Sequence, residues 1–386
     1  MQVRVLESLQ DIAAEDWNRL VDQNDPFLDH SFMWGLEKHQ CLGDRYGWLA
    51  RHLIATENGN VCGVMPLYLK DNSYGELVFD WGWADAYHRQ GLDYYPKLVN
   101  AVPYTPATGD RLLLEPDAGE QQRHNTANAL IQATLELGRQ ENVSSWHCLF
   151  PTEDGSKPFE ANGFFSRLGC QYHWRNEGYR DFDDFLESFT AKNRKKLKRE
   201  RRQVNDAGIR IQICHGHDMD DALWPVLAHF YQKTFLEKGG WDTLNQAFFQ
   251  HVGQTLKERF VVFFAWLKDR PIAAAICFRS DQTLYGRHWG SEDDYHSLHF
   301  ELCYYQGIEY CIRHGLKHFE PGAQGEHKVR RGFRPTATWS MHRLAHPTFH
   351  RLIHEHVQQE STMMRRYMND LQQHLPFKCD SPQIKP

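Results

Sequence analysis

The sequence lacks any apolar run close to the roughly 18 residues that a membrane-spanning helix needs, so we expect no span. Its opening, MQVRVLESLQDIAAEDW, alternates and then turns acidic, without the apolar core of a secretory signal. The nine cysteines are an odd number and include no C-x-x-C pair, which predicts neither a disulfide framework nor a zinc ribbon. Together these absences favour a protein of the reducing cytoplasm.

A large excess of charge of either sign is also missing. The formal net charge is −6 and the isoelectric point is near 6.4, which argues against indiscriminate binding to nucleic acid. Against this background, eight Lys or Arg residues and one Glu stand between Lys192 and Arg202. The positive charge is therefore concentrated locally, and we expect a local anionic partner or neighbour for it.

What is present is enough apolar material for two domains, since 41% of the 386 residues are hydrophobic and 12 are Trp. Residues 49–57 and 260–268 read as strands, and each is followed by a tight turn and a second strand. Tyr74-Gly75 falls on Tyr285-Gly286 at the same offset of 211, which predicts a three-stranded meander in two copies.

Each copy continues with a helix, at 121–141 and at 298–314, and then with a strand, at 144–150 and at 316–320. This order predicts an α+β unit that occurs twice, in domains 1–178 and 179–386. A basic helix at 190–204 lies between the copies, and a long polar helix follows Pro347, with room to pack back on the first domain.

Three phrases make the chain resemble a known family over nearly its whole length. FDWGWADAY (79–87), YYPKLVNAVPYTPATGDRLL (94–113) and FEPGAQGEHKVRRGF (319–333) resemble the FemAB-like, or peptidoglycan biosynthesis/recognition, branch of GNAT-type N-acyltransferases. The resemblance implies tandem GNAT-like domains, each with a mixed sheet flanked by helices. It also implies transfer of an acyl or aminoacyl group from acyl-CoA or aminoacyl-tRNA to a small-molecule or peptide amine, with no permanently bound cofactor. In that case tRNA is a candidate partner.

Two motifs carry the resemblance to particular residues. The basic-helix pattern K-x-R-x-x-x-(K/R) of Fem-type enzymes matches Lys192, Arg194 and Lys198, which implies that they bind the donor. In HKVRRGF, Lys328 matches the lysine of the Fem-type FK..(F/W)G phrase, but His327 replaces the aromatic residue and the final Gly-Phe pair is reversed. The pyrophosphate loop of ordinary GNAT enzymes has no counterpart, because HWGSEDDYHS (288–297) carries three acids there.

The glycine-rich segment GAQGEHKVRRGF has the groups that acyl transfer needs. Glu326 or His327 can accept the proton of the amine, and Lys328 or Arg331 can bind a phosphate or the carbonyl side of the donor. No nucleophile is required for direct attack, and the sequence has no G-x-S-x-G motif. The alternative is a solvated loop without a role in the reaction.

The aromatic stretch FDWGWADAYHRQGLDYYPKL is the candidate acceptor site. Trp81 and Trp83 supply walls, Asp85 and Lys97 supply charge, and Asp80 is a candidate base. The alternative is a buried aromatic corner whose Asp side chains cap turns.

The histidines and the basic helix complete the candidates. His346, His350 and His354 are spaced for one helix face, but no carboxylate or Cys completes a set of metal ligands, so we expect no metal.

The eight Lys and Arg side chains of the basic helix suit a polyanionic ligand, or else they form a solvated face neutralised by the acidic remainder of the protein. The rival to an N-acyltransferase is a non-catalytic module that recognises RNA or an anionic cell-wall precursor, and a second rival is an ordinary acetyl-CoA-dependent acetyltransferase.

Overall fold

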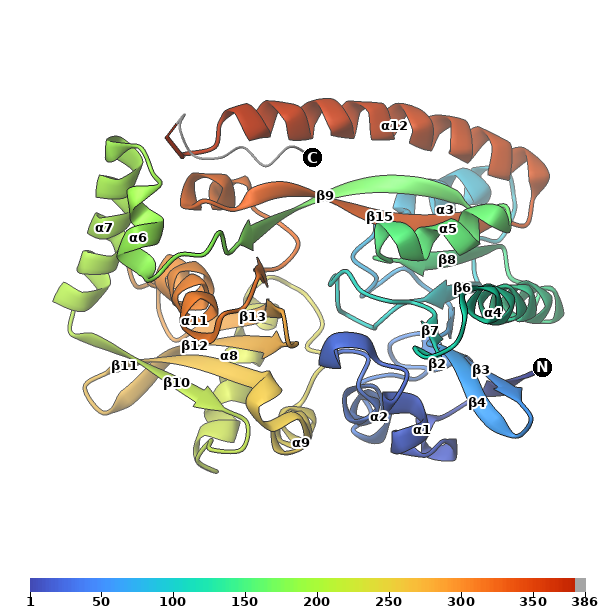
Figure 1. Cartoon of the computed structure of the whole chain (residues 1–386), viewed down its shortest axis with the longest axis horizontal. Helices are drawn as coiled ribbons and strands as arrows, with labels where there is room; N and C mark the ends of the chain where they lie inside the picture. Colours follow the sequence, from blue (N-terminus) through green and yellow to red (C-terminus); the bar gives the residue numbers. More distant parts are fainter. Residues whose placement is uncertain (379–386) are drawn as a thin grey trace. The chain divides into compact units, whose positions relative to one another are not determined.

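The structure of the chain is a computed structural model that describes residues 1–378, and these residues form two compact units (Figure 1). Unit 1 consists of Met1–Cys170 with Ala337–Arg366, and unit 2 of Gln171–Thr336 with the chain from Tyr367 onward. The sequence predicts a single division, after residue 178. In the structure the chain crosses between the units three times, because residues 337–366 return to unit 1.

Unit 1 contains two sheets with helices beside them. The first sheet has the order β1-β3-β4-β7. The second sheet has, within this unit, the order β2-β5-β6-β8-β15. Strand β6 runs parallel to β8, and β15 pairs antiparallel with β8. The elements are β1 (Gln2–Leu6), α1 (Ala14–Asn18), α2 (His30–Lys38), β2 (Trp48–Ala50), β3 (His52–Glu57), β4 (Asn60–Met65), β5 (Tyr68–Lys70), α3 (Trp81–Arg89), β6 (Lys97–Asn100), β7 (Leu113–Leu114), α4 (Glu120–Gln140), β8 (Ser145–Leu149) and α5 (Glu153–Ala161).

Unit 2 has one sheet with the order β10-β11-β12-β13-β14-β9. Strands β13 and β14 are parallel, and the pairs on either side of them are antiparallel. Its elements are α6 (Phe182–Glu187), α7 (Ala191–Asp206), β10 (Ile209–His215), α8 (Leu223–Glu237), α9 (Gln246–Leu256), β11 (Phe260–Leu267), β12 (Arg270–Arg279), β13 (Thr283–Ser291), α10 (Leu298–Phe300), α11 (Gln306–His314) and β14 (His318–Glu320). Three elements pass from one unit to the other: β9 (Phe165–Arg175), β15 (Arg334–Leu344) and α12 (Pro347–Gln373).

The predicted repeat is confirmed for the helices and for the strands that follow them, but its third strand is wrong in the first copy. Residues 74–79 form turns and bends, with Gly75 at φ +78° and Leu77 at φ +61°. This left-handed backbone ends any extended run. The counterpart of β13 is β6, since each lies antiparallel to a preceding strand and parallel to the strand after the next long helix. Tyr74-Gly75 and Tyr285-Gly286 therefore have different structures.

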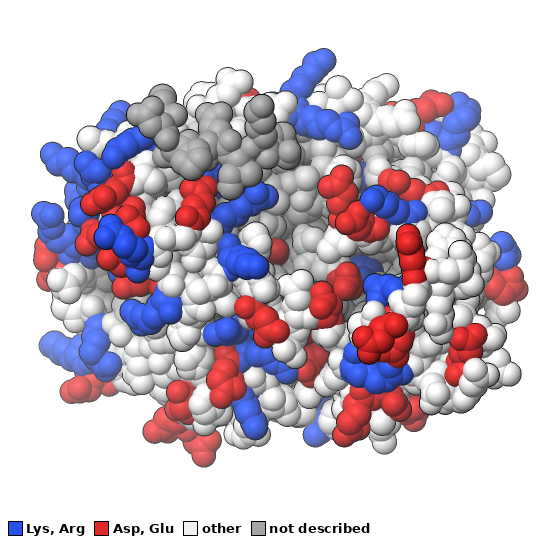
Figure 2. All heavy atoms as spheres, in the orientation of Figure 1, with Lys and Arg blue, Asp and Glu red and all other residues white. Residues whose placement is uncertain are grey.

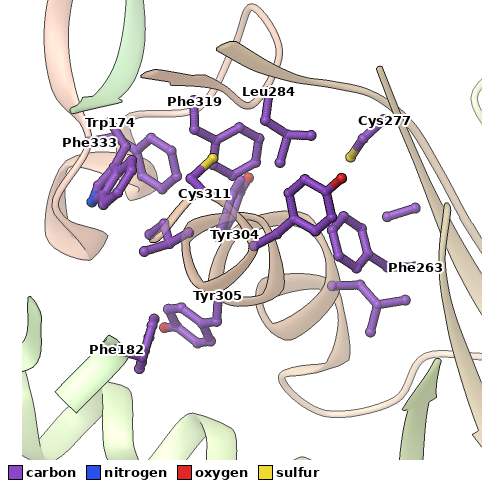
Figure 3. Packing of buried hydrophobic residues seen from close by; sticks show 14 of the residues in the cluster. Trp174, Phe182, Phe263, Cys277, Leu284, Tyr304, Tyr305, Cys311, Phe319 and Phe333 are labelled. Carbon is purple, nitrogen blue, oxygen red and sulfur yellow. The ribbon is translucent and has the colours of Figure 1, made fainter. Parts of the chain in front are cut away.

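An aromatic core fixes the central helix of unit 2 against its sheet, and Figure 1 shows α11 beside β13. A short π-helical segment, Glu301–Tyr305, separates α10 from α11. Figure 3 shows that its two consecutive tyrosines extend in different directions, with Tyr305 toward Phe182 and Tyr304 among other core residues. Tyr304 packs edge-on against Phe333 with ring centroids 5.4 Å apart. One helix thus connects the core with the glycine-rich segment that precedes Phe333.

Helix α7 confirms the predicted basic helix. Its buried face consists of Leu197, Val204 and, unexpectedly, Glu200. Figure 2 shows Lys and Arg side chains gathered over this helix, on the left of the view. A stripe this narrow leaves most of the helix circumference to charged side chains.

Candidate functional site

The parallel strands of unit 2 separate and leave a cavity between them, which we call the cleft. Strands β13 and β14 pair over three residues, from Thr283 opposite His318 to Tyr285 opposite Glu320. Beyond that point Gly286–Trp289 and Pro321–Gln324 line opposite sides of a cavity of about 550 Å³. A side chain at Gly286 would place its Cβ only 3.2 Å from the Cα of Pro321, so glycine permits the close start of the cleft.

A β-bulge bends strand β13 where it lines the cleft. Ile276 of β12 pairs with His288, whereas the next residue, Cys277, pairs with Gly286, so Arg287 is inserted between them. Bulges bend a strand and redirect its backbone, and they are frequent beside active sites. Gly286, which precedes the inserted residue, is the sign of this bulge in the sequence, because a glycine inside a strand often marks a bulge.

Lys328 is a buried cation at the cleft. Only 2% of its surface is exposed, and its Nζ donates a 2.6 Å hydrogen bond to the carbonyl of Gly322. Burial lowers the pKa of Lys328 to about 8, so the ammonium form predominates at neutral pH. Among the described residues no carboxylate forms an ion pair with it, and no carboxylate lines the cleft. The charge is therefore available to a ligand.

His327 lies beside Lys328, with its Nε2 2.8 Å from the hydroxyl of Tyr304. Partial burial and the nearby Arg331 and Lys328 lower the pKa of His327, so the ring is neutral at neutral pH and able to accept a proton. Glu326 accepts a hydrogen bond from the hydroxyl of Tyr367 and does not line the cleft. Of the two predicted bases, only His327 faces the cleft.

Arg331 connects the glycine-rich segment to helix α7. Its Nη2 lies 3.0 and 3.1 Å from the two carboxylate oxygens of Glu200, and its Nε donates to the hydroxyl of Tyr305. The guanidinium stacks 3.4 Å from the ring centroid of Phe300. Arg331 and Glu200 are 3% and 6% exposed. In this structure Arg331 therefore fixes the segment in place, while its predicted role toward the donor stays a prediction.

A cationic groove runs along α7, defined by six side chains: Lys192, Lys195, Lys196, Arg199 and Arg202 of α7, and Arg330. It has a volume of about 750 Å³, and no carboxylate lines it. Its α7 members recur every three or four residues, which places them on one helix face. A larger pocket of about 1140 Å³ shares Lys196 and Arg199 with the cationic groove and His327 with the cleft. The three cavities are therefore adjacent.

The predicted donor residues of α7 are distributed over different faces. Lys192 lines the cationic groove, whereas Lys198 makes a 2.9 Å ion pair with Asp183 and Arg194 is half-buried outside the groove. Sequence reasoning missed Lys195, Lys196, Arg199 and Arg202. Their helical spacing in the printed sequence would have identified them, because it places them on the face of Lys192.

The predicted acceptor residues lie in unit 1, and two of them meet. The Nζ of Lys97 donates to Ser73, Glu76 and Asp80 at 2.8, 2.8 and 2.5 Å, and the hydroxyl of Tyr94 donates to Asp80 at 2.7 Å. All five side chains are at most 5% exposed. The buried cluster is therefore closed to solvent, and the proposed role of Asp80 as a base is untested.

The other predicted acceptor residues surround this cluster without joining it. Trp83 is buried and contacts His342 edge-on at 4.8 Å between centroids. Trp81 is 42% exposed and packs against Tyr74, and Asp85 pairs with Arg89 on the surface of α3. Their roles in acceptor binding stay predictions.

Burial and pairing shift the pKa values of the cluster in opposite directions. Burial raises the pKa of Glu76 to about 7, although Lys97 opposes this shift. For Asp80 the effect of burial is outweighed by Lys97, and its pKa falls to about 2. The pKa of Lys97 is raised, because the two carboxylates outweigh its own burial. At neutral pH the cluster holds the Lys97–Asp80 ion pair, and Glu76 is the carboxyl of the cluster that takes up a proton more readily.

Within residues 1–378, no three His, Cys, Asp or Glu side chains gather where they could hold a metal ion. Of the three spaced histidines, His350 accepts a hydrogen bond from the backbone of Leu344, and His354 stacks on Phe165. None of the helices in this part of the chain has the length and apolar character to cross a bilayer.

Comparison with known proteins identifies the family and the fold. The FemAB-like family, described as peptidoglycan biosynthesis/recognition, matches residues 8–379. No curated protein matches the chain. FemX is 12% identical to this chain with a TM-score of 0.54, and the match covers 92% of this chain and 100% of FemX. L-PGS from Bacillus licheniformis is 10% identical with a TM-score of 0.51, and the match covers 84% of this chain and 95% of L-PGS. A tandem GNAT protein from the clavulanic acid biosynthesis pathway is 13% identical with a TM-score of 0.44, covering 90% and 99%. The predicted α+β fold, with mixed sheets flanked by helices in both units, is confirmed, and FemX and L-PGS share it.

Proposed function

We propose, from the premise that the chain belongs to the FemAB-like family of peptidoglycan biosynthesis and recognition, that it is an N-acyltransferase. It moves an acyl or aminoacyl group from a phosphate-rich donor to an amine by direct attack, and the cleft of unit 2 is the reaction centre. One observation carries the proposal: a buried lysine without a carboxylate partner, Lys328, lies where two parallel strands diverge, close to a cationic groove.

The cleft supplies the groups that this reaction requires. The amine attacks the carbonyl carbon of the donor, a C–N bond forms, and the C–O or C–S bond to the leaving group breaks. The Lys328 ammonium stabilises the oxyanion of the tetrahedral intermediate. Neutral His327 takes the proton of the attacking amine, either directly or through the hydroxyl of Tyr304 at 2.8 Å, and the leaving oxygen or sulfur is protonated in turn.

The cationic groove is the proposed site for the phosphates of the donor. No carboxylate lines the groove, although Lys196 lies 3.8 Å from Glu200. The pocket between the groove and the cleft shares residues with both, and its lining also includes four acidic residues: Glu200, Asp294, Glu326 and Asp370. The loop after β13, by contrast, carries Glu292, Asp293 and Asp294, which repel a pyrophosphate there. This charge distribution favours a donor whose phosphates lie along α7, as those of an aminoacyl-tRNA would, over the usual pose of acyl-CoA. The family description supports a peptide or small-molecule amine as acceptor.

Replacing Lys328 tests the proposal. We expect Lys328→Ala to lower the rate of transfer about 100-fold to 1000-fold, the usual effect of removing an oxyanion-stabilising group. The measurement is consumption of acetyl-CoA or of aminoacyl-tRNA by the purified protein, with and without a mixture of amines. Lys328→Met, which keeps most of the buried volume, should show the same loss of activity with little change in unfolding temperature, because Lys328 has a single hydrogen bond to Gly322.

The matched control is Lys317→Ala, an exposed lysine just before β14. It should leave donor consumption and the unfolding temperature unchanged. A folded Lys328→Ala variant with full activity would falsify the assignment of the cleft as the reaction centre.

The second candidate function is recognition without catalysis, and the cationic groove is the observation that favours it. Such a module would bind RNA or an anionic cell-wall precursor along α7 and leave every donor intact. Binding of tRNA together with unchanged acyl-CoA and aminoacyl-tRNA over a long incubation would support recognition and remove the transferase proposal.

A further inference from the structure

The cleft has an unbalanced charge, which bears on the kind of molecule it accepts. Lys238 and Lys328 both line it, and no Asp or Glu side chain does. Neither lysine forms an ion pair with a carboxylate of the described residues. The third cation, Arg287, has its pKa lowered to about 10 by burial, and the nearby Tyr231 and Glu320 oppose that shift. Two positive charges are therefore left without a protein counterion.

Lys238 is the more accessible of the two lysines. It follows α8 directly, in the exposed segment that leads toward α9. Its ammonium is close enough to His299 to act on the pKa of that ring, which burial, His327 and Lys238 together lower to about 4. Lys238 thus extends from a solvent-exposed backbone over the inner wall of the cleft. Lys328, in contrast, is fixed at the base by its bond to Gly322.

Aromatic side chains form much of the remaining wall. Phe235 and Trp289 line the cleft with Tyr304, from three different elements. Flat apolar faces with a few polar groups are typical of pockets for small organic molecules. The combination fits a molecule with an apolar or aromatic part and an anionic end.

The same surroundings act on the amine that must react. An ammonium entering the cleft would meet two lysines and no carboxylate, so its neutral form is favoured by burial and charge. The cleft histidines show this effect, since His288, His299 and His327 all have lowered pKa values with burial as the main cause. A neutral amine is the nucleophile in acyl transfer. The cleft therefore promotes the reactive form of the acceptor while attracting any anion attached to it.

We propose that the acceptor is an amino carboxylate, such as a free amino acid or a peptide whose carboxyl-terminal residue bears a side-chain amine, with its carboxylate held by Lys238. This inference rests on the proposed function, because it takes the cleft to hold the amine acceptor. Lys238 acts in binding and Lys328 in the reaction. The aromatic wall receives the side chain of the acceptor.

Binding of two matched probes tests the inference without any transfer step. N-acetyl-L-phenylalanine carries the carboxylate, and N-acetyl-L-phenylalaninamide replaces it by a neutral amide of nearly the same shape. By calorimetry or ligand-observed NMR at low salt, the acid should bind about tenfold more tightly than the amide, the effect of one partly solvated ion pair. Lys238→Met should remove this preference and Lys238→Arg should keep it.

Lys268→Met is the control, since Lys268 is exposed in the turn between β11 and β12 and lines none of the three cavities. Equal affinities for the two probes, no binding of either, or a preference that survives Lys238→Met would each overturn the inference. Failure of the inference can be distinguished from failure of the proposed function. Donor consumption without a preference for the carboxylate probe contradicts only the inference. A Lys238-dependent preference in a protein that consumes no donor contradicts only the transferase proposal.

Discussion

Within residues 1–378 each unit has one pair of parallel strands, and the two pairs end differently. In unit 2, β13 and β14 diverge after three paired residues and leave the cleft. In unit 1, β6 and β8 also pair over three residues, but the amide of Asn100 donates to the carbonyls of Pro66 and Arg111. Arg111 in turn donates to the carbonyls of Leu149 and Ala107, both at 2.7 Å. The topology offers the same opening twice, and in unit 1 side chains fill it.

Lys97 of unit 1 and Lys328 of unit 2 differ in the same way, whereas a third buried lysine, Lys70 of unit 1, donates to the side-chain oxygen of Asn72 and the carbonyl of Tyr74. Lys97, the first residue of β6, is fully buried and donates to a serine and two carboxylates. Lys328 is also buried but donates to a single carbonyl. Removal of a buried ion that its own protein neutralises leaves the partners buried and unpaired, whereas a buried ion without a counterion can take one from a ligand. On this comparison we propose a structural role for Lys97 and a functional role for Lys328, and the variants below test both.

The largest effect that separates the two lysines is on stability. Lys97→Met leaves Asp80 and Glu76 buried without their cation, and we expect a loss of about 3–5 kcal/mol in the free energy of unfolding. Urea denaturation followed by circular dichroism measures it. The equivalent loss for Lys328→Met, which also keeps most of the buried volume, should be small, because no carboxylate depends on that side chain.

Lys157→Met serves as the control for Lys97, since Lys157 is exposed and pairs with Asp154 on the surface of α5. Lys157→Met should lower the free energy of unfolding by well under 1 kcal/mol. The assignment fails if Lys97→Met unfolds at the same urea concentration as the parent protein yet loses donor consumption, since Lys97 would then act in the reaction, as its predicted acceptor role requires.

Much of this architecture was predictable, because it depends on local signals. The helix at 121–141 has Ala127, Leu130, Ile131 and Leu135 at helical spacing, and all four are buried in α4. Gly315, predicted to end the helix at 298–314, has a left-handed backbone at its C-terminal cap. These features arise from periodicity and from glycine, both of which a single segment reveals.

Features that depend on distant contacts were missed. The strand β6 begins with a lysine, and nothing in YYPKLVN shows that Glu76 and Asp80 neutralise this lysine. The sequence pattern therefore predicts the third strand at residues 74–79 instead. The glycine-rich segment was identified, but its neighbour Lys238 lies about 90 residues earlier and reaches the cleft only through the fold. Local patterns predict elements, whereas charge pairs across the fold decide which site is open.

The pH dependence of stability sharpens the comparison further. The pKa of Glu76 is raised to about 7, so the folded state binds this proton more tightly than the unfolded state does. Its contribution is fully present below the unfolded pKa near 4.5 and is lost as the pH rises through 7, which amounts to about 3 kcal/mol. Glu76→Gln removes this dependence.

Unfolding by urea between pH 4.5 and 7 measures it as the difference between the parent and Glu76→Gln. The difference cancels His147, whose pKa is lowered to about 3, mainly by burial, and which loses stability as the pH falls. The free energy of unfolding of Glu76→Gln should increase steadily relative to that of the parent protein as the pH rises. A difference that is constant with pH would show that Glu76 stays ionised in the folded protein and that the cluster carries a different charge.

The smallest predicted effect concerns the faces of α7 and separates the cationic groove from the rest of the helix. Lys195 and Arg199 line the groove, whereas Lys198 is paired with Asp183. We expect the double variant Lys195→Met, Arg199→Met to bind uncharged total tRNA about tenfold more weakly, and the slope of log affinity against log salt to fall by about 1–2, because each lost phosphate contact releases one fewer counterion. Lys198→Met should change affinity by less than about twofold, since its charge is already neutralised. Equal losses from both variants would mean that the charge of α7 acts as a whole and not through one face, and the donor would then have no defined path from the groove to the cleft.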